Sequence, residues 1–345
     1  MTLPKEVLVN DDDYNQGCVH GEDTMSDNRN RLGVIDIGSN SIRLIIYEAG
    51  SDRTSRMVHK AKETVRLGVR RDEHGNMSEQ DIWTVIPILH KFQDICRANR
   101  AAQIRAVATA AVRQSTNMED IIACWEQETG IAVQVLSGEE EAYYGFLGVT
   151  RSLPAHIHEG FIVDIGGGST EISYFKHEEL LHSTSLPCGA VNMTMQNGGR
   201  DTWNEQSRER LADKISSQLQ DYPWTAVHAG LPLIGLGGGI RALARMERER
   251  RHQLKPAGDP FPIEADTIHF YADALAGLNL EERIHQFDLA ADRADIIVAG
   301  TMILSTVFEH MQCSVLLASW RGLSDGLAHH TFNIAQTTQR QMNGQ

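Results

Sequence analysis

The sequence predicts an α/β protein with two related domains and a cleft between them. The first observation is a pattern that occurs twice, 128 positions apart: a β-branched strand with an aspartate near its end, a tight turn of small polar residues, and a second strand. The second observation is that strands alternate with amphipathic helical segments in both halves of the chain. The third is the length of 345 residues, for which two domains are the natural expectation.

The two hairpins carry the residues best suited to bind phosphate. The first copy spans residues 33–47 and contains Asp36, and the second spans 161–175 and contains Asp164. Glycines let backbone N–H groups approach a phosphate closely, and hydroxyl groups add donors. The candidate phosphate-binding residues of the two turns are Gly38, Ser39, Asn40, Ser41, Gly166, Gly167, Gly168, Ser169 and Thr170. The two aspartates can hold a divalent cation, usually through its waters, as Mg²⁺ prefers.

Two better-known phosphate-binding motifs do not fit. No Gly-Lys-Ser/Thr follows either strand, which excludes a Walker loop, and a strand follows each turn where a Rossmann fingerprint needs a helix. A single hairpin of this kind is usually only a turn. Two matched copies in two similar half-chains favour a phosphate held between them.

The remaining elements follow from hydrophobic spacing and from residues that cap helices. Ser78 is typical of a helix start, Gly130 is typical of a helix end, and Pro87 predicts a kink or a later start. In the first half we expect strands over 60–69, 104–109 and 131–136 and a helix over 115–129. In the second half we expect strands over 180–186, 233–236 and 314–318, and helices over 189–196, 203–220, 264–277 and 291–311. We also expect one helix that begins at Ile240 and a terminal helix beyond Leu323.

Composition excludes several classes of protein. The net charge of −14 argues against general nucleic-acid binding. No apolar stretch reaches the roughly 18 residues that a membrane helix needs. The five cysteines are scattered without a Cys-x-x-Cys pair, so neither a disulfide framework nor a zinc site is expected. Because no secretory leader is recognisable either, we expect a cytoplasmic protein.

Charge is distributed unevenly along the chain. Residues 1–28 are acidic and aperiodic, so we expect a disordered tail there. Residues 53–71 carry seven basic side chains and one acid, and form either a solvated surface or a positive wall for a polyanion. We expect a first domain over 29–140 and a second over 141–345, with the terminal helix able to pack back on the first.

Several charged residues have both a structural and a functional interpretation. Ser137 precedes three glutamates at 139–141, and a capped helix favours acids in its first turn through its dipole alone. Beside two phosphate turns, however, we expect one of these acids to point into the cleft. Arg43 and Arg113 are either solvated or directed at the cleft, and the glycines at 237–239 are either a helix-entry turn or part of a substrate route.

These residues resemble the actin/Hsp70/sugar-kinase (ASKHA, ribonuclease H-like) superfold, and within it the exopolyphosphatase/guanosine pentaphosphate phosphohydrolase (Ppx/GppA) phosphatase family. The matching motifs run in family order over residues 31–330. They are Asp36-Ile-Gly-Ser-Asn-Ser-Ile-Arg43-Leu, Val65-Arg66-Leu67-Gly68, Ala106-Val-Ala-Thr109-Ala-Ala-Val-Arg113, Leu136-Ser137-Gly138-Glu139-Glu140-Glu141-Ala142, Asp164-Ile-Gly-Gly-Gly-Ser-Thr-Glu171, Gly237-Gly-Gly239 and Arg293-Ala-Asp295-Ile-Ile-Val-Ala-Gly300.

The resemblance implies two actin-like domains with an active-site cleft between them, and a role for each matching residue. The turns would cradle a terminal phosphate, Arg43 and Arg113 would contact its oxygens, and Glu141 would activate the attacking water. A Mg²⁺ ion, with a monovalent cation such as K⁺ as an optional second ion, would be held by Asp36, Asp164 and Glu171. The substrate route would be lined by Arg66, Gly237, Gly238 and Gly239.

Two stretches depart from the family pattern. Tyr143 and Tyr144 stand after Ala142, where the family often has Glu-Ala-Arg-Leu, and we expect this to change a charge on the cleft side of the helix. His329 and His330 replace a commoner arginine-glutamate-glycine ending, and we expect them on the surface of a terminal helix. The length resembles the short form of the family, without C-terminal HD-type domains.

We therefore expect a Mg²⁺-dependent phosphohydrolase that releases orthophosphate from the end of inorganic polyphosphate. The nearest alternative substrate is guanosine pentaphosphate, a signal of the stringent response, with guanosine tetraphosphate as a further ligand. Two other classes are a phosphotransferase of the same superfold and a non-catalytic sensor, although a sensor has no need of a water-activating base. A homodimer is an alternative to a monomer, since pairing would extend a channel for a polyanion.

Overall fold

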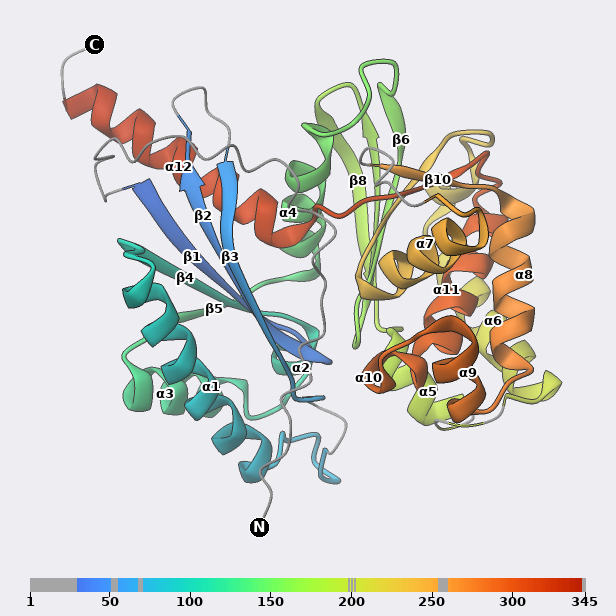
Figure 1. Cartoon of the computed structure of the whole chain (residues 1–345), viewed down its shortest axis with the longest axis horizontal. Coiled ribbons are helices and arrows are strands. Elements are labelled where there is room, and N and C mark those ends of the chain that lie inside the picture. The colour runs from blue at the N-terminus through green and yellow to red at the C-terminus, as the bar shows by residue number, and fades with distance from the viewer. Residues whose placement is uncertain are drawn as a thin grey trace.

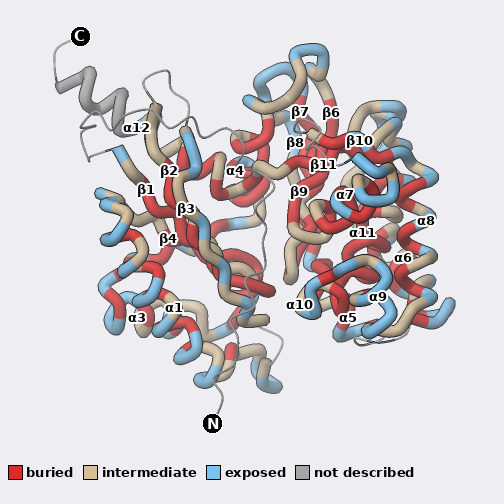
Figure 2. The backbone as a smooth tube through the Cα atoms, in the orientation of Figure 1, coloured by how far each residue is buried: buried red, intermediate tan, exposed pale blue. Residues whose placement is uncertain are grey.

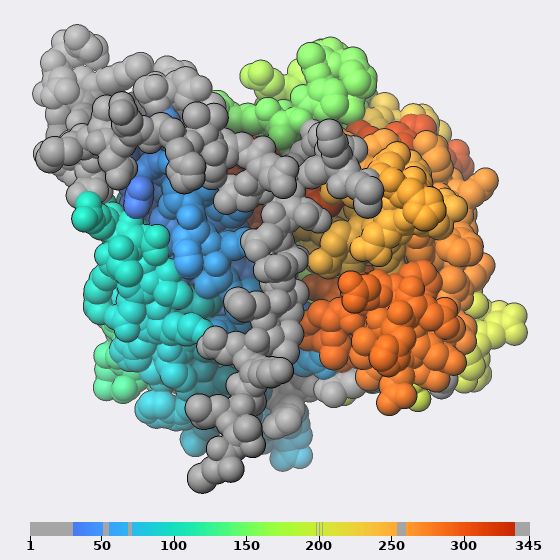
Figure 3. Space-filling view, in the orientation of Figure 1, coloured from blue at the N-terminus to red at the C-terminus, as the bar shows by residue number. Residues whose placement is uncertain are grey.

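The computed structural model describes residues 30–50, 55–67, 71–197, 199, 201, 203–253 and 260–342, with side chains described up to residue 334. Within these ranges the chain forms two lobes side by side, each built on one β-sheet covered by helices (Figure 1). In the space-filling view, the early residues in blue and cyan and the late residues in orange occupy opposite sides of the molecule (Figure 3). The predicted tail, residues 1–28, lies outside the described residues, as do Arg53 and Arg70 of the basic segment.

The first lobe is built on a five-stranded sheet of order β3-β2-β1-β4-β5. Its strands are β1 (Arg31–Ile37), β2 (Ser41–Ala49), β3 (Ser55–Thr64), β4 (Gln103–Ala108) and β5 (Val133–Val135). Its helices are α1 (Glu79–Ala98), α2 (Ala110–Arg113) and α3 (Met118–Thr129). β1 pairs antiparallel with β2, as the hairpin pattern predicts, and parallel with β4. A core that includes Ile35, Leu44, Phe92 and Trp125 joins the sheet to α1 and α3.

The second lobe is built on a six-stranded sheet of order β10-β11-β9-β6-β7-β8. Its strands are β6 (Glu159–Ile165), β7 (Thr170–Lys176), β8 (Glu179–Leu186), β9 (Leu233–Leu236), β10 (Phe261–Ile263) and β11 (Leu316–Ala318). Its helices are α5 (Ala190–Asn197), α6 (Glu205–Gln220), the 3₁₀ turn η3 (Pro223–Ala226), α7 (Gly238–Arg250), α8 (Ala265–Ala276), α9 (Leu280–Phe287), α10 (Ala291–Ala294) and α11 (Ile297–His310). Its strand interiors are buried like those of the first lobe (Figure 2). β6 pairs antiparallel with β7 and parallel with β9, so its centre repeats that of the first sheet.

Two helices connect the lobes. α4 (Gly138–Thr150) follows β5 of the first lobe and contacts β6, β7 and β8 of the second. α12 (Leu323–Met342) follows β11 of the second lobe, packs along α4, and reaches β1 and β2 of the first (Figure 1). A small core of this region includes Val34, Tyr47, Tyr144 and Leu327. The last helix of the chain is thereby anchored on the first sheet.

Capping residues explain several helix boundaries. The Ser78 hydroxyl accepts the Asp81 N–H at 3.1 Å at the start of α1, and Gly130 ends α3 with a left-handed φ of 69°. The alternative of a later start for α1 is wrong, because the helix begins at Glu79 and continues through Pro87. Pro87 is exposed, so water can reach the carbonyl that its missing N–H leaves unpaired.

Other sequence predictions were wrong in their boundaries. The strand expected over 60–69 is β3, which ends at Thr64 because the chain turns at Arg66 with a φ of 56°. The helix expected over 291–311 is divided into α10 and α11. The helix expected from Ile240 is α7, which begins at Gly238 and so includes two of the three glycines in its first turn. The short elements α2, α9 and β10 had no counterpart in the sequence analysis.

Candidate active site

The two polar turns have the same geometry and touch each other. The Gly38 N–H donates to the Ser41 carbonyl at 3.1 Å, and the Gly166 N–H donates to the Ser169 carbonyl at 3.0 Å. A Cβ atom on Gly168 would lie 2.5 Å from the Ser39 Oγ, which is too close for two non-bonded atoms. A side chain on Gly168 would therefore require the Ser39 hydroxyl or one of the turns to shift where the two lobes meet.

Asn40 stands out in the first turn. Its side chain is only 7% exposed, yet neither Oδ1 nor Nδ2 has a hydrogen-bond partner. Its backbone carbonyl accepts the N–H groups of Val65 and Arg66, both at 3.1 Å, which fixes the residue in place. A buried amide without partners costs stability unless a ligand or water satisfies it, so this side chain indicates a binding site.

The hydroxyl groups of the turns divide into two kinds. Thr170 donates to the Cys188 carbonyl at 2.5 Å, so its proton is used within the second lobe. The Ser169 hydroxyl bonds to the Glu171 carboxylate and so links the turn to the acid that follows it. Ser39 and Ser41 are both buried at the first turn. The Thr170 and Ser169 hydroxyls are thus both engaged within the second lobe.

The aspartates occupy matching places before the turns. Asp36 is the strand partner of Arg43, and Asp164 is the strand partner of Glu171. Burial is the main cause that raises the pKa of both aspartates, and the positive charges of Arg43 and Arg241 oppose it. The charge of Asp36, on the first lobe, also contributes to the raised pKa of Asp164 on the second.

A second pair of loops carries a matching pair of arginines. In the first lobe, Thr109 follows the end of β4, and the Arg113 N–H donates to the Thr109 carbonyl at 3.0 Å. In the second lobe, Gly237 follows the end of β9, and the Arg241 N–H donates to the Gly237 carbonyl at 3.2 Å. Sequence reasoning found Arg113 but missed Arg241. The signal was present, because the two arginines are separated by the same 128 positions as the two aspartates.

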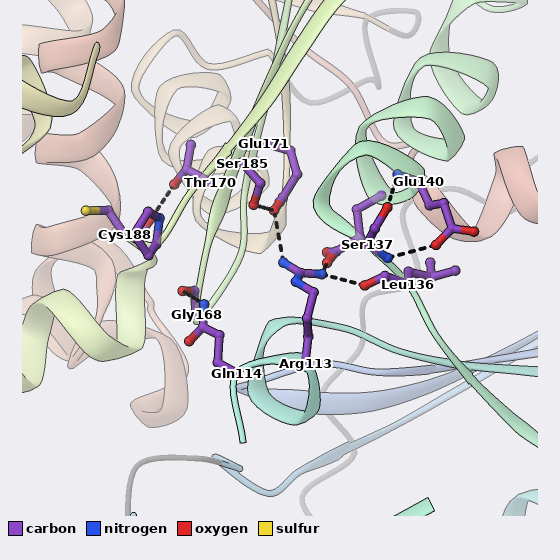
Figure 4. Close-up of polar contacts among 12 residues, drawn as sticks. Arg113, Gln114, Leu136, Ser137, Glu140, Gly168, Thr170, Glu171, Ser185 and Cys188 are labelled. Atoms are coloured by element: carbon purple, nitrogen blue, oxygen red, sulfur yellow. Dashed lines mark hydrogen bonds and ion pairs between the residues drawn. The ribbon is translucent and has the colours of Figure 1, made fainter. Parts of the chain in front are cut away.

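Arg113 of the first lobe contacts an acid of the connecting helix α4 and lies near an acid of the second lobe. Its Nη1 donates to the Leu136 carbonyl at 2.7 Å and to the Glu141 carboxylate, and its Nη2 lies 3.8 Å from the Glu171 carboxylate (Figure 4). The Ser185 hydroxyl donates to the same Glu171 oxygen at 2.7 Å. The guanidinium thereby fixes the positions of two carboxylates beside the turns.

Glu141 is the buried acid of its run, and its carboxylate contacts Arg113. Its side chain is 9% exposed, whereas Glu139 is exposed and Glu140 closes a capping box with Ser137. Burial, and then the charge of Glu171, raise the pKa of Glu141 well above its usual value, against the effect of Arg113. Such a carboxylate is a stronger base than an ordinary glutamate, which suits proton transfer near neutral pH.

The three predicted metal ligands do not form a direct coordination cluster. Within the described part of the chain, no three His, Cys, Asp or Glu side chains are grouped so that they could hold a metal ion. The charge of Asp36 nevertheless contributes to the raised pKa of Asp164, and burial and then Asp164 raise the pKa of Glu171 to about 7. This donor set fits an ion held by one or two carboxylates and several waters, with the unpaired Asn40 Oδ1 as a further oxygen.

The predicted substrate-route residues lie at the edges of the site. Arg66 projects from the first lobe and pairs with Asp295 of the second at 2.5 Å. Gly237 has a φ of 96°, and a Cβ there would lie 2.6 Å from the Ile165 carbonyl and 3.1 Å from the Asp164 Oδ1. Gly238 and Gly239 form the first turn of α7, beside the turn that carries Asp164.

The expectation that Tyr143 and Tyr144 alter the cleft side of α4 is wrong. Tyr144 is buried in the core beneath α12, and its ring lies 5.6 Å from that of His330. Tyr143 is 39% exposed, and its ring lies 6.3 Å from His330. Both tyrosines lie on the face of α4 that packs against α12. The tyrosine pair and the histidine pair, which both depart from the family pattern, therefore pack on each other. His329 and His330 are accordingly half-buried rather than on the surface.

Comparison with known proteins gives consistent matches. The sequence model of the Ppx/GppA phosphatase family matches residues 44–333. The chain is 28% identical over 300 residues to exopolyphosphatase 1 of Mycobacterium tuberculosis, covering 86% of this chain and 87% of that protein. It is 27% identical over 328 residues to exopolyphosphatase 1 of Mycobacterium leprae, covering 91% and 95%.

Solved structures show the same relationship. An exopolyphosphatase from Cytophaga hutchinsonii superposes with a TM-score of 0.80 at 25% identity, covering 88% of this chain and 98% of that one. A Ppx/GppA family member from Aquifex aeolicus superposes with a TM-score of 0.74 at 28% identity, with the same two coverages of 88% and 98%. Across the described residues, no helix has the length and apolar character needed to cross a membrane. The paired turns, the repeated sheet and the family match over most of the chain lead to one conclusion: this chain belongs to the Ppx/GppA phosphatase family and has its two-domain, actin-like fold.

Proposed function

We propose that this chain is an exopolyphosphatase that hydrolyses the terminal phosphoanhydride bond of inorganic polyphosphate. The observation that carries the proposal is Arg113, which holds the buried Glu141 carboxylate beside Glu171 and the phosphate turns. Several relatives of similar length are named exopolyphosphatases, which supports polyphosphate over guanosine pentaphosphate as the substrate.

In the proposed mechanism the turns hold the terminal phosphate in place for attack. Backbone N–H groups and the hydroxyls of Ser39 and Ser41 would donate to its oxygens, with Arg43 adding positive charge. Glu141 would take one proton from a water molecule as the water oxygen forms its bond to phosphorus. The bond from phosphorus to the bridging oxygen breaks, and the shortened chain leaves with that oxygen and its electron pair. Positioning and charge cancellation account for most of the catalysis in such reactions.

A divalent cation is part of the proposal. The family suggests a divalent metal dependence, and we propose Mg²⁺, with K⁺ as an optional second ion. Asp36, Asp164 and Glu171 would hold the ion, partly through water, with the Asn40 amide close by. When bound, Mg²⁺ supplies positive charge that neutralises phosphoryl oxygens.

The charge of the protein is consistent with these partners and this location. A net charge of −14 disfavours nucleic acid, so the basic groups near the site would serve a shorter polyanion.

We place the enzyme in the cytoplasm, where reduced thiols are the rule, and Cys96, Cys124, Cys188 and Cys313 are all free. A homodimer remains part of the proposal, with oligomeric state measurable by light scattering.

The proposal is tested by orthophosphate release from long-chain polyphosphate and from guanosine pentaphosphate, measured side by side on the same preparation. We expect a higher kcat/KM with polyphosphate, and binding that weakens as salt is added because the interaction is electrostatic. A markedly higher kcat/KM with guanosine pentaphosphate would reject polyphosphate as the preferred substrate. An absence of release from both, with intact fold and added Mg²⁺, would reject the reaction itself.

A further inference from the structure

The glycine turn of the second lobe packs against the start of α5. The Ala190 N–H donates to the Gly166 carbonyl at 2.9 Å, and the Val191 N–H donates to the Gly167 carbonyl at 2.9 Å. The first N–H groups of a helix have no partner within that helix, so the turn supplies the acceptors that α5 needs. A Cβ on Gly189, just before the helix, would lie 2.4 Å from the Gly167 carbonyl carbon. The two backbones are therefore in direct contact.

The third carbonyl of this turn is held by a side chain. The Asn192 Nδ2 donates to the Gly168 carbonyl at 3.0 Å and to the Pro187 carbonyl at 3.1 Å. The Asn192 Oδ1 accepts the Gly189 N–H at 2.7 Å. Only this orientation of the amide satisfies its neighbours, because the flipped amide would place Oδ1 against two carbonyl oxygens. From the first lobe, the Gln114 Nε2 makes a longer contact of 3.4 Å with the same Gly168 carbonyl (Figure 4).

These hydrogen bonds set the direction in which the N–H groups of the turn point. In a trans peptide unit, the C=O of one residue and the N–H of the next point in opposite directions. Since the three glycine carbonyls are bonded to α5, the N–H groups of Gly167, Gly168 and Ser169 point away from that helix. Among the described residues, no backbone carbonyl accepts any of these three N–H groups. They are therefore available to a phosphate oxygen.

The first lobe lies against the other side of the same turn. A Cβ on Gly167 would lie 3.0 Å from the Ser39 Cβ, and a Cβ on Gly168 would lie 2.5 Å from the Ser39 Oγ. The turn is therefore enclosed between the start of α5 and the turn of the first lobe. Rotation of the peptide that follows Gly168 would redirect the Ser169 N–H, and the Asn192 side chain opposes that rotation.

We propose that Asn192 is a positioning residue, which fixes the peptide between Gly168 and Ser169 so that its N–H donates to the phosphate under attack. This inference rests on the proposed function, because it assumes that the turn holds that phosphate. Preorganised donors act most strongly on the charge that develops in the transition state. Loss of Asn192 should therefore lower kcat and leave KM nearly unchanged.

The first test is Asn192→Ala, with Gln196→Ala as the matched control. Gln196 is an exposed amide of the same helix, and it accepts a hydrogen bond from Lys214 of α6 at 2.8 Å. We expect kcat of Asn192→Ala for long-chain polyphosphate to fall about tenfold or more, with KM within about twofold of the wild type. The control should keep the wild-type kcat. An unchanged kcat, or a change confined to KM, would overturn the positioning role.

Asn192→Leu separates hydrogen bonding from packing. Leucine has nearly the shape of asparagine, but its side chain neither donates nor accepts hydrogen bonds. We expect the same fall in kcat as in Asn192→Ala, measured well below the melting temperature of each variant. A purely structural role would lower the melting temperature and leave kcat of the folded enzyme unchanged. Wild-type kcat in Asn192→Leu would therefore assign the side chain to packing and overturn the proposal.

Binding of orthovanadate separates this inference from the proposed function. Vanadate can take the five-coordinate geometry of a phosphorus under attack, so it uses the donors that face the transition state. Calorimetric titration should show binding about tenfold or more weaker in Asn192→Ala than in the wild type. That result supports the positioning role even if the wild type releases no orthophosphate from polyphosphate, in which case only the proposed reaction fails. Equal affinities, or no vanadate binding by the wild type, would overturn the role of Asn192 and leave polyphosphate hydrolysis to its own assay.

Discussion

Replacing Arg113 tests how the acids of the site are held. Arg113→Met removes the guanidinium that donates to Glu141 and to the Leu136 carbonyl and lies 3.8 Å from Glu171. A hydrogen bond to a charged group contributes about 1.5–3 kcal/mol, so kcat/KM should fall about 10-fold to 150-fold. Arg113 lowers the pKa of Glu141, against burial and Glu171. Without it that pKa rises further, and the acidic limb of the pH profile should move to higher pH.

Arg113→Lys distinguishes charge from geometry. Lysine keeps the positive charge but cannot reach the Leu136 carbonyl and both carboxylates at once. We expect a reduced kcat with an acidic limb close to that of the wild type. The assay is orthophosphate release from polyphosphate between pH 5 and 9, with Arg105→Met, which removes an arginine from the rim of the first lobe, as the control. Wild-type kcat/KM and an unmoved acidic limb in Arg113→Met would refute the positioning role.

Three other predictions concern packing and the tail. Gly168→Ala should lower kcat/KM about tenfold or more, because its Cβ would lie 2.5 Å from the Ser39 Oγ and push the turns apart. The control is Gly277→Ala, whose Cβ would have no contact under 3.6 Å and which should leave phosphate release unchanged. Glu247→Gln should lower the free energy of unfolding by about 1–3 kcal/mol, because the fully buried carboxylate accepts hydrogen bonds from Arg250 and Arg251 at 2.6–2.7 Å. An unchanged midpoint of unfolding in denaturant would contradict this prediction. Deleting residues 1–28 should leave melting temperature and turnover nearly unchanged, and a loss of several degrees would show that the segment packs on the folded chain.

The repeated hairpin could be predicted because it depends on local rules. Strand propensity, turn residues and the spacing of 128 positions specify both hairpins, and Ser137 with Glu140 specifies the start of α4. These signals involve residues close together in the chain, where geometry is nearly independent of the rest of the fold.

Other features of the site depend on how the two lobes meet. The pairing of Arg66 with Asp295 and the packing of Tyr144 under α12 join residues far apart in sequence, so no local pattern reports them. Arg241 was different, because the repeat itself predicts it as the counterpart of Arg113 in the second lobe. The sequence does not reveal whether three acids converge on one ion. That depends on the relative placement of the two lobes to within about an ångström.

The central claim is that Glu141 activates water against a phosphate held by the two turns. Its most direct test is kcat for long-chain polyphosphate in Glu141→Gln, with the exposed Glu139→Gln of the same helix turn as the control. We expect a fall in kcat of about 10²–10⁴ for Glu141→Gln, the usual contribution of a general base. We also expect unchanged or tighter polyphosphate binding by Glu141→Gln, and near-normal turnover in Glu139→Gln. Near-wild-type turnover in Glu141→Gln, with intact fold and metal dependence, would contradict the account.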